Sequence, residues 1–83
     1  MDTQQAFIVY AENHAMPFRL GIWRITIAQI SADEFTSKVC RRSGLKERNH
    51  MEVDERFTSV DEAIEASKIF ILKMMSKSEL SPP

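Results

Sequence analysis

The chain has 83 residues, 43% hydrophobic and 28% charged, and its 11 Lys and Arg against 12 Asp and Glu give a formal net charge of -1. This length supports one hydrophobic core of modest size, and the balanced charge excludes the strongly basic class of nucleic-acid-binding proteins. The single cysteine excludes an internal disulfide, and residues 1–14 contain too short an apolar run for a signal peptide or a membrane span.

The first part of the chain carries the patterns of two β-strands joined by an irregular connection. The segment 6–11, AFIVYA, is rich in β-branched and aromatic residues and predicts a first strand. Pro17 and Gly21 punctuate residues 12–21, which we expect to form a loop. A second strand follows over residues 22–30, with alternate residues on its core face. These core residues are Trp23, Ile25 and Ile27.

Two further strands are predicted around a basic segment. Alternating apolar and polar side chains predict a third strand over residues 35–42, joined to the second by a hairpin. The segment 39–50, VCRRSGLKERNH, is interpreted as the end of this strand and a loop that turns at Gly44. Residues 50–57 predict a short fourth strand, with an extended loop as the alternative. The expected inward-facing residues are Phe35, Ser37, Val39, Met51, Val53 and Phe57.

The last predicted element is a helix that begins after Ser59. Ser59 and Glu62 have the spacing of a capping box, in which each side chain satisfies a backbone amide at the helix start. A continuous apolar stripe follows at helical spacing and provides a face that covers the sheet. The stripe consists of Val60, Ala63, Ile64, Ser67, Phe70, Ile71, Met74 and Met75.

Together these elements predict an α+β fold of two layers. The order is βββ(β)α, a three- to four-stranded antiparallel β-meander packed against one C-terminal α-helix. We expect a single domain over residues 1–83, with an ordered core at about 6–76 and flexible tails at 1–5 and 77–83. A lone cysteine favours a reducing compartment, so we expect a cytoplasmic protein without membrane contact.

Apolar residues outside the expected core indicate a contact surface. Ile69 and Leu72 lie opposite the core stripe of the helix, and Ile22 and Ile30 lie on the outward face of the second strand. Because so short a chain buries little core, association with a second copy or another protein would add stability. We therefore expect a non-enzymatic protein–protein interaction module that forms a homodimer or binds a protein partner.

The basic segment supplies an alternative function, the binding of nucleic acid or another phosphate-bearing partner. Arginine side chains can fork onto phosphates, and the glycine between them would let the backbone approach. A solvated hairpin loop is the competing interpretation of the same charges. Glu52 and Asp54, on the exposed face of the next strand, would repel phosphates, so this function takes second place. The basic residues concerned are Lys38, Arg41, Arg42, Lys46 and Arg48.

The sequence contains no recognised catalytic or metal-binding motif. Cys40 and His50 would form a nucleophile pair only if the fold brought them within hydrogen-bonding distance, with a third group to orient the imidazole. His14 and His50 have no partner at the spacing of a metal-binding motif. We therefore expect no enzymatic activity, no cofactor and no metal.

Overall fold

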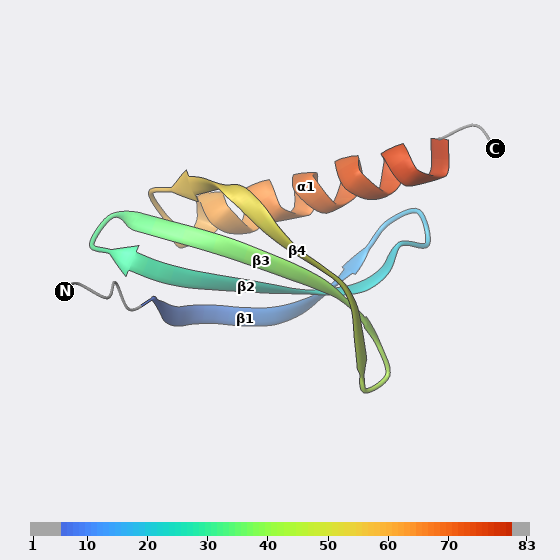
Figure 1. Cartoon of the computed structure of the whole chain (residues 1–83), viewed down its shortest axis with the longest axis horizontal. Coiled ribbons are helices and arrows are strands. Elements are labelled where there is room, and N and C mark those ends of the chain that lie inside the picture. Colours follow the sequence, from blue (N-terminus) through green and yellow to red (C-terminus); the bar gives the residue numbers. More distant parts are fainter. Residues whose placement is uncertain (1–5, 81–83) are drawn as a thin grey trace.

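The computed structural model describes the backbone of residues 6–80 and the side chains of residues 6–76. It is a four-stranded antiparallel sheet followed by one helix, which confirms the predicted α+β fold (Figure 1). The strands are neighbours in chain order, β1-β2-β3-β4, so β1 and β4 form the two edges of the sheet. The elements are β1 Phe7–Met16, β2 Gly21–Ser31, β3 Glu34–Ser43, β4 Lys46–Phe57 and α1 Val60–Leu80.

The hydrophobic core lies between α1 and one face of the sheet. Alternate residues of β2 and β3 are buried there, as the sequence pattern predicts. Trp23 is fully buried, and its indole nitrogen donates a hydrogen bond of 2.8 Å to the Leu20 carbonyl. The opposite face, here called the uncovered face, carries no second layer within residues 6–80 (Figure 1). The main buried apolar residues are Trp23, Ile25, Ile27, Phe35, Val39, Val53, Phe57, Ala63 and Ile71.

The start of α1 has one of the two predicted capping contacts, and the second is shifted by one residue. The Ser59 hydroxyl accepts a hydrogen bond from the Glu62 amide at 3.1 Å. The Glu62 carboxylate reaches back and accepts from the Thr58 amide at 2.9 Å, one residue earlier than the capping box predicts. Both contacts satisfy backbone donors that would otherwise lack partners near the start of the helix. The residues of α1 with no exposed surface are Ala63, Ser67 and Ile71, which stand four apart.

Strand β1 is longer than predicted, because residues 12–16 continue the strand instead of forming a loop. Backbone pairing with β2 persists as far as Met16, which lies opposite Gly21. Pro17 comes directly after the last paired residue, where its missing amide hydrogen costs no ladder hydrogen bond. The expectation of a loop over 12–21 is therefore wrong for its first half.

The connection between β1 and β2 is a tight turn over residues 17–20. The Leu20 amide donates a hydrogen bond to the Pro17 carbonyl at 3.2 Å, and both central residues, Phe18 and Arg19, have a φ of 59°. Positive φ at both central positions defines a type I′ turn, whose twist matches that of paired strands. This turn allows the hairpin to continue to its tip without a longer loop.

The basic segment forms the third hairpin of the sheet, between β3 and β4, so its interpretation as a loop is wrong. Pairing between β3 and β4 continues to Ser43 opposite Lys46, and only Gly44 and Leu45 remain as the turn. Gly44 has a φ of 64°, which glycine adopts without the steric cost that a side chain would add. Strand β4 therefore begins at Lys46, ahead of the predicted start of the 50–57 strand.

The helix is also longer than predicted. It continues to Leu80, so residues 77–80, which the sequence assigns to a tail over 77–83, are helical. The remaining tail residues, 1–5 and 81–83, lie outside the described residues. Within residues 6–80, no helix combines the length and hydrophobicity needed to cross a membrane.

Candidate functional site

The uncovered face of the sheet is more apolar on the β1 and β2 side than on the β3 and β4 side, although Arg24 of β2 also lies on this face. On β1 and β2, strand alternation and pairing direct Ile8 and Ile22 to this face, where they are 69% and 49% exposed. On β3 and β4, charged side chains take the equivalent positions. The β1 and β2 side is therefore the part of this face that water solvates least well. The charged residues of the β3 and β4 side include Lys38, Arg42, Glu47 and Glu52.

The two edges of the sheet also differ in character: the start of the β1 edge is apolar, and the β4 edge is charged. Phe7, Ile8 and Val9 follow one another on the β1 edge and are 65%, 69% and 44% exposed. The register with β2 shifts at Val9, so β1 has a β-bulge at this point. Charged edge residues oppose pairing with another strand, and β1 has none before Glu12. On β4 the exposed charged residues include Glu52, Asp54, Glu55 and Arg56.

The apolar residues expected to form a contact surface lie in different environments. Ile69 is 51% exposed on α1, as predicted, whereas Leu72 is partly buried and packs against the core. The placement of Leu72 on the outer helix face is therefore wrong. Ile22 is half-exposed on the uncovered face, and Ile30 is partly buried at an irregularity in the pairing of β2 with β3. These four residues do not form one continuous patch.

Two of the five basic residues predicted to bind phosphate have acidic partners in the same sheet. The Arg42 guanidinium lies 2.6 Å from the Glu47 carboxylate, and the Lys38 ammonium lies 3.7 Å from the Glu52 carboxylate. Both pairs join β3 to β4 across the hairpin. Their charges are therefore largely balanced within the protein.

Arg41 and Arg48 form a different arrangement. They lie directly opposite each other in the ladder of β3 and β4, on the face opposite to Cys40, and neither forms an ion pair within the described side chains. The Arg41 guanidinium also lies close to Gly21, where a β-carbon would approach its Nε to 3.1 Å. Lys46 is exposed at the nearby hairpin end. Like charges in directly opposed positions destabilise a sheet.

A bulge in β4 brings together three side chains that are separated in sequence. Val39 pairs with Met51 and Arg41 pairs with Arg48, so Asn49 and His50 both lie opposite the single residue Cys40. Asn49 has a φ of 54°, a conformation that asparagine tolerates better than most residues. The extra residue reverses the alternation of β4 on its N-terminal side. Glu47 consequently faces the same side of the sheet as His50 and Cys40.

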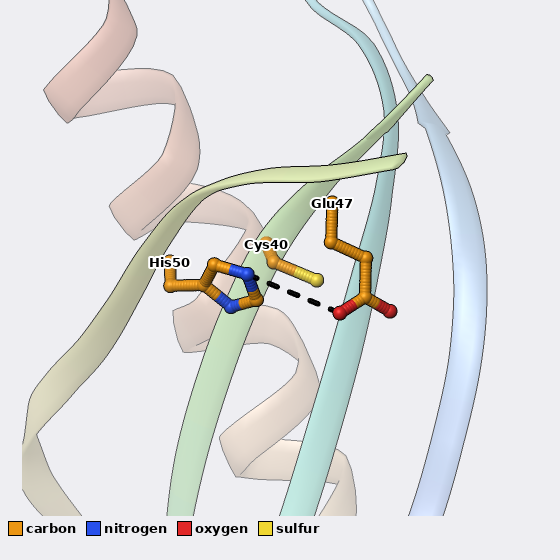
Figure 2. Close-up of side chains that lie close together, drawn as sticks. All are labelled: Cys40, Glu47 and His50. Carbon is orange, nitrogen blue, oxygen red and sulfur yellow. Dashed lines mark ion pairs between the residues drawn. The ribbon is translucent and has the colours of Figure 1, made fainter. Parts of the chain in front are cut away.

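Figure 2 shows these three side chains converging, with Cys40 on β3 and Glu47 and His50 on β4. One ligand-type atom from each residue can be chosen so that all three lie within 4.8 Å of one another. The His50 Nε2 atom lies 3.9 Å from Glu47 Oε1, and the other Glu47 oxygen contacts Arg42. The three residues line a shallow pocket on the uncovered face, together with Arg24, Thr26, Lys38 and Val39.

Burial is the largest influence on Cys40, which is 7% exposed, and it raises the pKa of the thiol. The negative charge of Glu47 raises this pKa further. The positive charges of Arg42 and Arg24, and a backbone hydrogen bond with Arg24, oppose the shift without cancelling it. The Cys40 thiol is therefore neutral at neutral pH and is a weak nucleophile in this state.

The sequence raised the pairing of Cys40 with His50 but offered no reason to expect it. The third member, Glu47, lies three residues before His50, in no motif that assigns it to a site. An extra residue in one strand leaves no regular signature in a sequence, because every pattern based on a period of two assumes uninterrupted pairing. Asn49, as a residue that tolerates positive φ, was the only local indication.

Comparisons with known proteins add no identification. No protein-family model matches the chain, and neither a curated protein nor a solved structure matches it.

Proposed function

We propose that this protein is a non-enzymatic interaction module that forms a homodimer through the edge strand β1. The observation that carries the proposal is the run of exposed apolar residues Phe7, Ile8 and Val9 on an edge with no charged residue before Glu12. An edge strand presents unpaired backbone amides and carbonyls to any strand that can approach it. Pairing β1 with β1 of a second copy would satisfy these groups and extend the sheet.

A second copy suits this edge better than a charged partner. Antiparallel pairing of residues 7–11 about a twofold axis places them against the same neutral segment of the second copy, so this contact desolvates no charged side chain. The β4 edge, by contrast, carries several charged residues that resist such pairing. A domain of this size also buries a limited fraction of its surface and benefits from association.

The proposed interface differs from the surface expected from the sequence. Ile22 and Ile30 lie on β2, directly beside β1, whereas Ile69 and Leu72 lie on the helix. Leu72 contributes to the core of the single chain, so it is not free to serve a partner. We therefore place the dimer contact on the β1 side of the sheet.

Analytical ultracentrifugation of two matched lysine variants tests this proposal. Wild-type protein at high micromolar concentration should sediment with about twice the chain mass of 9.6 kDa. Ile8→Lys introduces a charge into the proposed interface and should give a monomer with an unchanged circular dichroism spectrum. Leu45→Lys makes the same change at the β3–β4 turn, where Leu45 is 97% exposed, and should remain dimeric. A monomeric wild type, or equal dissociation of both variants, would contradict the proposal.

The state of Cys40 supports a role without catalysis. A cysteine nucleophile requires a thiolate, and burial raises the pKa of this thiol instead of lowering it. The 3.9 Å separation of His50 from Glu47 is also too long for the hydrogen bond that would orient a catalytic imidazole. A buried free thiol is compatible with the reducing conditions of the cytoplasm, which we propose as the location.

The opposed arginines support a second candidate function, the binding of nucleic acid or another phosphate-bearing ligand. An anion between Arg41 and Arg48 would relieve their repulsion, and Lys46 lies near the same hairpin end. With about three phosphates neutralised, the logarithm of the affinity should fall with the logarithm of salt at a slope of about -3.

Fluorescence anisotropy with mixed-sequence DNA and RNA oligonucleotides at low salt tests this second function. The double variant Arg41→Ala/Arg48→Ala should weaken binding and flatten the salt dependence. Lys38→Ala is the matched control, because Lys38 is paired with Glu52 and should contribute little. If wild-type protein binds neither oligonucleotide, or if both variants weaken binding equally, these arginines do not form a phosphate site.

A further inference from the structure

We infer that Cys40, Glu47 and His50 form a binding site for a divalent zinc-type metal ion. The inference rests on geometry and donor chemistry: a thiol, an imidazole and a carboxylate converge on one pocket of the uncovered face (Figure 2). These are the three side-chain types that bind zinc in proteins. The site lies away from the proposed β1 interface, since its three residues belong to β3 and β4.

The distances are close to those that a tetrahedral ion requires. Zinc bonds of about 2.0–2.3 Å at tetrahedral angles place neighbouring ligand atoms roughly 3.3–3.8 Å apart. His50 Nε2 and Glu47 Oε1 already lie 3.9 Å apart, and all three ligand atoms lie within 4.8 Å of one another. The side chains of His50 and Glu47 are 65% and 40% exposed, so small rotations can close the remaining gap. Cys40 is buried and provides a fixed point for them.

The surrounding contacts prepare Glu47 for this role. Its Oε2 atom contacts the Arg42 guanidinium at 2.6 Å, which leaves Oε1 on the side of His50. An outer partner that holds one carboxylate oxygen is a common means of orienting a metal ligand. The positive charges of Arg24 and Arg42 near Cys40 oppose the approach of a cation. We therefore expect weaker binding than at a site formed by several cysteines.

Binding should release a proton, because the metal requires a thiolate and the pKa of Cys40 is raised in the free protein. One proton is displaced from the Cys40 sulfur as the metal–sulfur bond forms. Affinity should consequently increase as pH rises toward the thiol pKa. Three protein ligands leave the fourth tetrahedral position for water.

Cobalt(II) titration of purified protein provides the direct test, because a cobalt–thiolate bond gives a charge-transfer absorption in the near ultraviolet. Wild-type protein should develop this absorption with a stoichiometry of one ion per chain, and zinc should abolish it by competition. Loss of outer partners commonly weakens metal binding by roughly 10- to 100-fold. Removal of a direct ligand in Cys40→Ser or His50→Gln should therefore weaken binding by at least about 100-fold.

The chain contains a matched control in its other histidine. His14 lies on β1, where its Nε2 atom is hydrogen-bonded to the Tyr10 hydroxyl at 2.7 Å, and His14→Gln should bind cobalt as the wild type does. The monomeric Ile8→Lys variant should also bind normally, which separates this inference from the proposed dimer. Absence of the thiolate absorption, its persistence in a folded His50→Gln variant, or its loss in Ile8→Lys would overturn the assignment to a site within one chain.

Discussion

Ser37 and Ser67 share a buried hydrogen bond, but replacement of each serine by alanine should lower the free energy of unfolding by a different amount. Ser37 on β3 and Ser67 on α1 are 2% and 0% exposed, and their hydroxyl groups contact each other in the core. The Ser67 hydroxyl also lies 2.6 Å from the Ala63 carbonyl, to which it donates its single proton. The Ser37 hydroxyl must therefore donate to the Ser67 oxygen.

Substitution of each serine by alanine leaves a different group without its partner. Ser67→Ala removes the acceptor of the buried Ser37 hydroxyl, and an orphaned buried donor costs about 1–3 kcal/mol. Ser37→Ala leaves Ser67 still donating to Ala63, so we expect the smaller loss of about 0.5–1.5 kcal/mol. The double variant has no orphaned donor and should be no less stable than Ser67→Ala alone.

Urea unfolding should be measured for the parent protein, the two single serine variants and the double variant, all carrying Ile8→Lys. This double-mutant cycle then contains no contribution from dimer dissociation. With a denaturant slope of about 1 kcal/mol per molar, a loss of 2 kcal/mol lowers the unfolding midpoint by about 2 M. If both single variants lose the same stability and their losses add in the double variant, the inferred direction of the hydrogen bonds is wrong.

Three further predictions concern the helix and the buried thiol. Ser59→Ala should destabilise the protein by about 1 kcal/mol in thermal unfolding, whereas Ser59→Gly should cost only a few tenths. In urea unfolding, Ile71→Ala should lower the free energy of unfolding by about 2–5 kcal/mol, and Ile69→Ala, at a half-exposed position, by less than about 0.5 kcal/mol. Equal losses would contradict the orientation of the helix on the sheet. The pKa of the Cys40 thiol is raised in the folded state, so folding favours the protonated thiol. The stability that this shift contributes is complete below the unfolded-state pKa and declines as pH rises through the folded-state pKa. Reaction of the native thiol with a disulfide reagent should accordingly reach half its limiting rate at a higher pH than in denatured protein.

The fold could be predicted from one periodicity and one capping residue in the sequence. Alternation in β2 and β3 placed Trp23, Ile25 and Val39 correctly, because one face of each strand is buried against a single helix. The capping residue Ser59 located the start of α1. Neither inference required knowledge of distant contacts.

The lengths of the hairpins could not be predicted in the same way. Pro17 suggested an early break in β1, but it lies just beyond the last paired residue and only ends the strand. Glycine at position 44 suggested a loop, yet it supports a turn of two residues. A turn residue indicates where the chain reverses, whereas the number of paired residues beside it depends on cross-strand contacts.

The candidate metal site depends on the least predictable feature of the fold. Without the extra residue beside Asn49, Glu47 would face the helix side of the sheet and could not approach Cys40. Leu72 illustrates a similar limit, since a helical wheel defines the centre of the buried stripe better than its margins.

Isotope-filtered nuclear Overhauser spectroscopy on an equimolar mixture of labelled and unlabelled chains tests the proposed β1 dimer most directly. This experiment detects only proton pairs that belong to different chains. Pairing of the two edges predicts intermolecular contacts that involve Phe7, Ile8 and Val9, together with slow exchange of β1 amides. Intermolecular contacts confined to Ile69 and the helix would contradict the β1 dimer. The absence of any intermolecular contact, at concentrations where the measured mass is that of a dimer, would contradict it as well.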